Sequence, residues 1–137
     1  MSLSSDLKTV LEADAALMAL LTSGIFIDVE EISRQNTPGA FDANGEIQPC
    51  ALLKLGVESK AGPYARSVRT PFRIYVYQRQ GYDVIDPALD LMFDDLNDVK
   101  ITGGVWNIEF SNTINGQRDQ ALDCALGSQI YNAIRLR

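Results

Sequence analysis

The chain has 137 residues, a formal net charge of −6 at pH 7 and no histidine. Its hydrophobic content of 46% and charged content of 22% are typical of a folded globular protein rather than a disordered one. The missing histidine excludes Ser-His-Asp and Cys-His catalytic arrangements within one chain. Two cysteines without histidine cannot complete a four-ligand zinc site. We expect a single domain over residues 1–137.

The net negative charge and the distribution of apolar residues exclude further classes of protein. A strongly acidic domain is a poor general binder of nucleic acid, because most of that affinity comes from Lys and Arg neutralising phosphates. The sequence has no run of 18 apolar residues, so we expect no membrane span, and no basic segment before an apolar block, so we expect no secretory signal. Cys50 and Cys124 form no CxxC motif. We expect two reduced thiols in a protein folded in a reducing cytoplasm, with a disulfide as the alternative.

The first part of the chain predicts two short helices and a strand. Ser4, Ser5 and Asp6 offer caps for a first helix. Continued helix would place Asp14 on the apolar face at a high cost, so we expect Asp14 to cap a second helix instead. Gly24 is suited to end that helix. The expected elements are helices at 7–13 and 15–22 and a strand at 25–32.

Two loops enclose the next strand. Turn-forming residues dominate 34–46, whereas Ala51, Leu53, Leu55 and Val57 alternate along a strand at 47–58. Pro49 suggests a strand entry or an edge position. Residues 59–67 form a second, basic loop that is a candidate partner-contact arm.

A strand followed directly by an amphipathic helix forms the centre of the chain, at 68–99. Phe72, Ile74 and Val76 alternate with polar or aromatic residues, which predicts a strand with one face on a core. Asp86-Pro87 is typical of a helix start. One apolar stripe then follows the helix: Ile85, Ala88, Leu89, Met92, Leu96 and Val99.

Two strands complete the chain. Gly103-Gly104 closes the helix region, and a strand at 105–114 places Trp106, Ile108 and Phe110 in the core. Asn115-Gly116 predicts a hairpin turn. A final strand is expected at 121–136, with a possible bulge at Gly127 and a same-side apolar set of Leu122, Cys124, Leu126, Ile130, Ile134 and Leu136. The element order predicts an α+β fold: a mostly antiparallel sheet of about five strands with helices packed on one face.

Aspartates recur every four residues on the central helix, at Asp86, Asp90, Asp94 and Asp98. Each like-charge pair at this spacing costs roughly 0.2–0.5 kcal/mol, so helix stability does not explain the stripe. The alternatives are a solvated outer face, a face that meets a basic partner, and a divalent-cation site, which no calcium-loop pattern supports.

Arginines follow the preceding loop and strand, at Arg66, Arg69, Arg73 and Arg79. They form either a polar sheet face with Tyr75 and Tyr77 or a basic band that meets the acidic helix of a neighbouring copy. Opposite charge patches on one chain allow head-to-tail contacts, which can close into rings. We therefore take these four arginines and the four aspartates as candidate subunit-contact residues, and we predict no catalytic, cofactor-binding or metal-ligating residues.

The order of elements resembles one phage family. The leading segment Leu7–Leu21, the strand Phe72-Arg-Ile-Tyr-Val-Tyr77, the Gly81-Tyr82 step before the acidic helix, and Arg118-Asp119 before a last strand ending Tyr131-Asn-Ala-Ile-Arg135 carry the likeness. Together they resemble the tail terminator, or tail completion, proteins of long-tailed phages and prophages, also grouped as minor tail proteins.

The resemblance implies a structural protein of the virion tail or neck. It implies an α+β subunit that assembles with itself into a ring of six, contacts tail-tube and head-completion proteins, and stops tube growth at the head-proximal end. It implies neither catalysis nor a cofactor, and neither specific nucleic-acid binding nor membrane binding.

Two alternatives stay open at this point. One is a head-to-tail adaptor or minor capsid protein. The other is a small-molecule-binding α+β module, for which Arg73, Tyr75, Tyr77 and Asp90 could supply polar groups.

Overall fold

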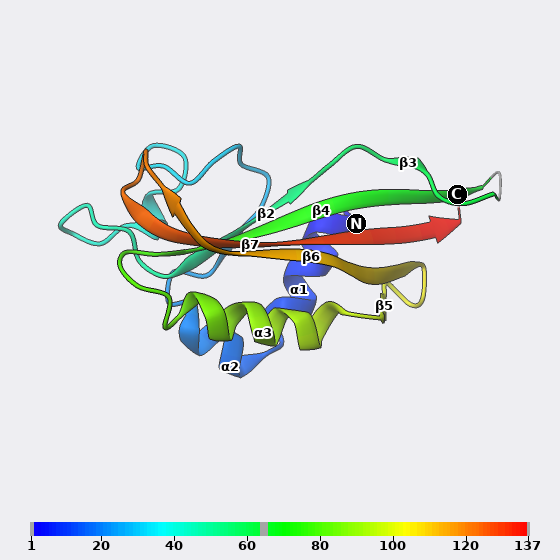
Figure 1. Cartoon of the computed structure of the whole chain (residues 1–137), viewed down its shortest axis with the longest axis horizontal. Helices are drawn as coiled ribbons and strands as arrows, with labels where there is room; N and C mark the ends of the chain where they lie inside the picture. The colour runs from blue at the N-terminus through cyan, green and yellow to red at the C-terminus, as the bar shows by residue number, and fades with distance from the viewer. Residues whose placement is uncertain (1, 64–65, 137) are drawn as a thin grey trace.

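The computed structural model describes residues 2–63 and 66–136, and in it helices cover one face of a mixed sheet (Figure 1). The helices are α1 (Leu3–Glu12), α2 (Ala15–Leu20), the 3₁₀ turn η1 (Pro38–Ala40) and α3 (Ile85–Leu96). The strands are β1 (Ile25–Phe26), β2 (Cys50–Leu55), β3 (Ser59–Lys60), β4 (Ser67–Gln78), β5 (Val99–Ile101), β6 (Trp106–Asp119) and β7 (Cys124–Leu136).

The strand order is β1-β2-β4-β7-β6-β5, with β3 paired to β4. All pairs are antiparallel except β1 with β2. The α+β class is confirmed, but the expected five-stranded sheet is wrong. Seven strands are present among the described residues, and they form a curled half-barrel. The two extra strands, β3 and β5, come from segments that the sequence predicts as a loop and as the end of the central helix.

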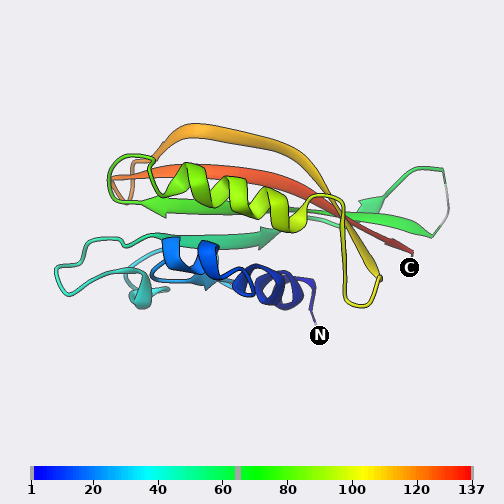
Figure 2. The ribbon, with the colours of Figure 1, turned by 90° about the horizontal axis from the view of Figure 1, so that it is seen from below.

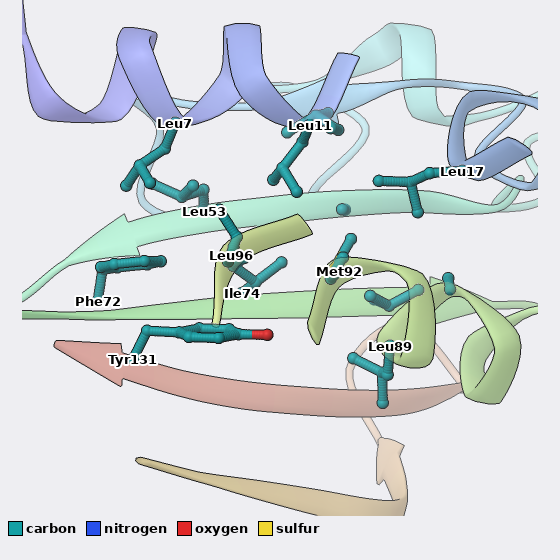
Figure 3. Close-up of a cluster of buried hydrophobic side chains, with 14 of the residues drawn as sticks. Leu7, Leu11, Leu17, Leu53, Phe72, Ile74, Leu89, Met92, Leu96 and Tyr131 are labelled. Atoms are coloured by element: carbon teal, nitrogen blue, oxygen red, sulfur yellow. The ribbon is translucent and has the colours of Figure 1, made fainter. Parts of the chain in front are cut away.

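The main core lies between the sheet and α1, α2 and α3 (Figures 2 and 3). The predicted alternation in β4 is confirmed, because Phe72, Ile74 and Val76 are almost fully buried against the helices. Tyr131 of β7 is fully buried and stacks on Phe72 with ring centroids 5.3 Å apart. Its hydroxyl donates to Gln129, whose amide in turn donates to the Leu89 carbonyl of α3. The ring pair therefore joins β4 to β7, and the Gln129 hydrogen bond joins α3 to the sheet.

The first two helices differ from the prediction mainly at their ends. α1 begins at Leu3, because Ser2 rather than Ser4, Ser5 or Asp6 is its N-cap and forms a capping box with Ser5. The predicted break is confirmed: Asp14 is the N-cap of α2, and its carboxylate accepts from Leu17 N–H at 3.1 Å. α2 ends at Leu20, two residues before the predicted end.

Two predicted strands are shorter than expected. β1 covers Ile25–Phe26 instead of 25–32, because Asp28 has a left-handed backbone with φ of 61° that ends the extended segment. β2 runs from Cys50 to Leu55 rather than 47–58, with Pro49 just before its start, as the entry interpretation predicts. Val57 is predicted on the same strand as Ala51 and Leu53, but it lies beyond the strand end and is 83% exposed, so this part of the prediction is wrong.

The start of α3 is capped by a residue from the neighbouring strand. Asp86-Pro87 is expected to start the helix, but the helix begins at Ile85 and Asp86 already lies in its first turn. The Gln78 side-chain oxygen accepts from the N–H groups of Val84 and Ile85, at 2.9 and 3.2 Å. A distant glutamine thus supplies the acceptor that a local aspartate is expected to supply.

The Asn115-Gly116 turn prediction is wrong. β6 continues through this dipeptide to Asp119, and the register with β7 shifts between Ile114 and Gln117, so the dipeptide forms a bulge opposite Gly127. Gly116 has φ of 67°, which glycine adopts without strain. The hairpin turn lies at 120–123 instead. The predicted irregularity at Gly127 is therefore real, although the extra residue is on the partner strand.

Gly103-Gly104 has positive φ at both residues, as suits a tight turn, but it joins β5 to β6 rather than closing the helix. Trp106 and Ile108 are buried as predicted, and Phe110 packs at the core margin.

Candidate functional site

The sheet has a second side, which we call the open face because it lies away from α1, α2 and α3. Strand alternation and register place Arg69, Arg73 and Tyr75 of β4 on this side, directly beside Ile134, Ile130 and Ser128 of β7. The predicted same-side apolar set of β7 also lies here. Its side chains therefore point away from the helices, while Ala125, Tyr131 and Ala133 fill the core.

A loop covers one half of the open face. Residues between β1 and β2 carry Ile32, Ala40 and Ile47 onto the sheet, where they bury Cys50, Leu52, Tyr77 and Cys124 in a second cluster. The other half has no such cover: Ile130 and Ile134 are only partly buried, and Leu136 is 75% exposed. β7, inside the sheet, therefore presents apolar side chains that the loop between β1 and β2 leaves accessible.

The four candidate arginines separate into two groups. Arg69 and Arg73 share the open face, and the Arg73 guanidinium lies 5.7 Å from the centroid of the Tyr75 ring. Arg66 is exposed just before β4, and Arg79 follows the other end of that strand. Arg79 forms an ion pair with Glu46 at 3.0 Å, which ties it to the covering loop. The structure thus brings together two of the four arginines.

Three of the four candidate aspartates share one surface. Asp86, Asp90 and Asp94 are exposed on the outer side of α3, whose inner side is buried by the predicted stripe. Asp98 is also exposed, but it lies beyond the helix end and has φ of 57°. None of these aspartates forms an ion pair with a residue in the described ranges. We call Asp86, Asp90 and Asp94 the acidic helix face.

The two charged surfaces lie on opposite sides of the sheet. α3 packs on the helix side of the sheet (Figure 2). Its three aspartates are exposed on the outer side of the helix, whereas register places Arg69 and Arg73 on the other side of β4. Arg69 and Arg73 also form no ion pair within the described residues. One copy cannot bring these two surfaces together, but two copies can.

A hollow of about 310 Å³ lies on the open face beside Arg73. Its lining combines apolar groups of Pro71, Tyr75 and Ile130 with the cationic side chains of Lys54 and Arg73. Lys54 pairs with Glu30 at 3.3 Å, so Arg73 is the cation of this hollow without an ionic partner among the described residues. Such a lining suits an apolar group that adjoins a negative charge.

Sequence reasoning missed a carboxyl pair between two helices. Asp95 of α3 contacts Asp14, the cap of α2. Burial, followed by the hydrogen bond with Asp14 and its charge, raises the pKa of Asp95 to about 7. The hydrogen bond from Asp95 lowers the pKa of Asp14. Asp95 is therefore the member of the pair whose carboxyl resists ionisation.

The two cysteines are free and buried in the cluster under the loop. Burial raises the pKa of the Cys50 thiol to about 12 and that of Cys124 to about 11. Over residues 2–63 and 66–136, no three Cys, Asp or Glu side chains gather as a metal site would require. No helix in those ranges combines the length and the hydropathy needed to cross a bilayer.

The apolar part of the open face also escaped the prediction, although a signal for it was present. β7 carries apolar residues at both parities, which is the pattern of a strand covered on both sides. The sequence places Ile130, Ile134 and Leu136 on one side of β7. It does not show that the opposite side of the strand is the one that packs on the helices.

The comparisons with known proteins support the fold. No family model matches the chain, and no curated protein matches it. Among solved structures, it is similar to a chain from the virion of a native gene transfer agent particle, with a TM-score of 0.69 and 18% sequence identity. The match covers 99% of this chain and 96% of the other. At this identity the likeness is one of fold.

Proposed function

We propose that this protein is a structural component of a phage-like virion, and specifically the tail terminator subunit that forms a ring at the head-proximal end of the tail tube. The likeness to a chain of a gene transfer agent virion, which extends over nearly the whole of both chains, is the observation that carries the proposal. The resemblance of element order to tail terminator proteins supports the finer role.

The charge distribution is compatible with that position. A ring at the end of a tail tube surrounds the path of DNA, and a subunit with net charge −6 repels phosphates rather than binding them. Unpaired charges of opposite sign on opposite sides of the sheet also suit a subunit that contacts a copy on each flank. On this proposal the protein acts in assembly and catalyses no reaction, and its partners are its own copies, tail-tube subunits and head-completion proteins.

Removal of the gene from the genome that encodes it tests the role directly. Electron microscopy of the resulting particles should show tail tubes of excessive and variable length without heads, because nothing ends tube growth. Complementation with the wild-type gene should restore normal length. Tails of normal length that lack heads would instead identify a head-to-tail adaptor and overturn the terminator role. Unchanged, infectious or DNA-transferring particles would overturn both.

A biochemical test uses the purified protein. Added to polymerising tail-tube subunits, it should shorten the tubes in proportion to its concentration, as a terminating subunit does. Tube lengths that do not respond at any ratio would contradict the proposal.

A further inference from the structure

The exposed half of the open face carries apolar side chains of the kind that are usually buried, but no other segment among the described residues covers them. Ile130 and Ile134 lie next to Arg73 and Arg69 in register, so apolar and cationic side chains alternate across β4 and β7. Leu136 extends the apolar row to the end of β7 at 75% exposure. Exposed apolar patches with a polar rim on a folded protein mark interaction sites.

The edge of the sheet is a less suitable contact. β5 pairs only with residues 106–108 of β6, which leaves the rest of that edge available. Two register shifts, at Phe110/Asn112 and Ile114/Gln117, interrupt the strand there. Bulges on an edge strand prevent another strand from adding to it. A partner is therefore expected on a face rather than at this edge.

The charges identify the partner. The exposed half of the open face carries Arg69, Arg73 and Lys100 without ion pairs among the described residues. Its carboxylates are Glu109 and Glu30, and Glu30 is already paired with Lys54. The acidic helix face carries Asp86, Asp90 and Asp94, likewise unpaired. Complementary potentials of this kind set register and partner choice across an interface.

We propose that the open face of one copy binds the acidic helix face of the next copy, with Arg69 and Arg73 opposite Asp90 and Asp94 and with Ile130 and Ile134 in the buried centre. This inference rests on the proposed function, because it gives the contact from which the ring is built. Since the two surfaces lie on opposite sides of the subunit, each copy keeps one of them available after binding, and the contact is head-to-tail.

Mixing of two variants tests the arrangement. The first, Arg69→Glu with Arg73→Glu, destroys the open face, and the second, Asp90→Arg with Asp94→Arg, destroys the acidic helix face. By sedimentation velocity, the wild type should self-associate, and each variant alone should be monomeric, with apparent association weakened at least about tenfold. Mixed in equal amounts, the variants should associate again, because the unchanged pair of surfaces and the pair with reversed charges are each complementary.

Matched controls are available on exposed charges outside both surfaces. Lys60→Glu and Glu31→Arg change charge by the same sign as the two variants and should leave association unchanged. Association in the mixture also shows that both variants are folded.

Three results would overturn the inference. If the Asp90→Arg, Asp94→Arg variant still self-associated and only the Arg69→Glu, Arg73→Glu variant lost self-association, two open faces would bind each other in a symmetric contact. Wild-type association in both variants would place the contact elsewhere, and a wild type that is monomeric at every concentration would remove the contact altogether. None of these results bears on tube length after gene removal, so the proposed function is tested separately.

Discussion

The two sides of one sheet differ in what covers them. On the helix side, α1, α2 and α3 bury the alternate residues of β2, β4 and β7 almost completely. On the open face, the loop between β1 and β2 buries one half, and the other half keeps Ile130, Ile134 and Leu136 accessible. The same strands thus supply a complete core on one side and an incomplete one on the other. The helix side therefore carries the main core, and the exposed half of the open face is the surface that we propose to lie between copies.

The largest effect should come from truncating the same residue type on each side. Ile74 is fully buried on the helix side, whereas Ile134 is only partly buried on the open face. We expect Ile74→Ala to lower the free energy of unfolding by about 2–5 kcal/mol and Ile134→Ala by less than about 1 kcal/mol. Urea denaturation at a concentration where the protein is monomeric measures both. Equal losses would mean that the open face is as important to the fold as the helix side.

Crowding the helix side should have the next largest effect. A Cβ added at Gly127 of β7 would lie 2.6 Å from Ile85 Cγ2 and 3.0 Å from Leu89 Cδ1, so α3 would have to move away from the sheet. Gly127→Ala should destabilise the protein by about 1–3 kcal/mol. Gly39→Ala is the control, because a Cβ there meets no atom within 4 Å and its φ is not positive. Calorimetry should show a lower melting temperature for the first variant alone, and a similar fall for both would refute close packing at Gly127.

The remote cap of α3 should contribute less. Gln78→Ala removes the acceptor for Val84 N–H and Ile85 N–H, which should lower stability by about 1 kcal/mol. Gln80→Ala, on an exposed residue of the same type two positions along, should have no effect on unfolding. Amide hydrogen exchange should locate the loss at the first turn of α3. Unchanged protection there would show that another group satisfies these amides.

The difference between the two sides also explains what the sequence could predict. Alternation in β4 and the stripe of α3 predicted the helix-side core correctly, because burial on one side leaves a periodic pattern. β7 carries apolar residues on both sides, so its orientation stayed hidden until its pairing with β4 was seen. The cap comes from Gln78, six residues before Val84, and the bulge at Asn115-Gly116 depends on the pairing with β7. Neither contact follows the periodic patterns from which helices and strands are predicted.

The candidate site was predictable to a similar extent. Its charges are visible as repeats, so Arg69, Arg73 and the aspartates of α3 were identified from spacing alone. Their placement on opposite sides follows only from the register of β4 and the packing of α3. Asp98 and Arg79 fit the repeats but fall outside the surfaces, because α3 ends at Leu96 and Arg79 pairs with Glu46.

A last effect should appear in the dependence of stability on pH. The pKa of Asp95 is about 7 in the folded protein, above the ordinary value of 3.8 that it regains on unfolding. The folded state therefore binds more protons between these values, and this residue makes stability fall as the pH rises from about 4 to about 7, with no further loss above. The charges that face it, Asp14 and Asp94, act in the same direction on its pKa.

Asp95→Asn separates this contribution from the rest of the protein. The amide can donate to the Asp14 carboxylate at every pH, so the variant should lose this fall in stability and exceed the wild type at pH 8. Asp94→Asn, an exposed neighbour on the same helix, should keep the fall and serves as the control. Thermal unfolding from pH 4 to pH 8 measures all three proteins. If Asp95→Asn kept the wild-type dependence of stability on pH, the Asp95 carboxyl between α2 and α3 would not titrate in this pH range.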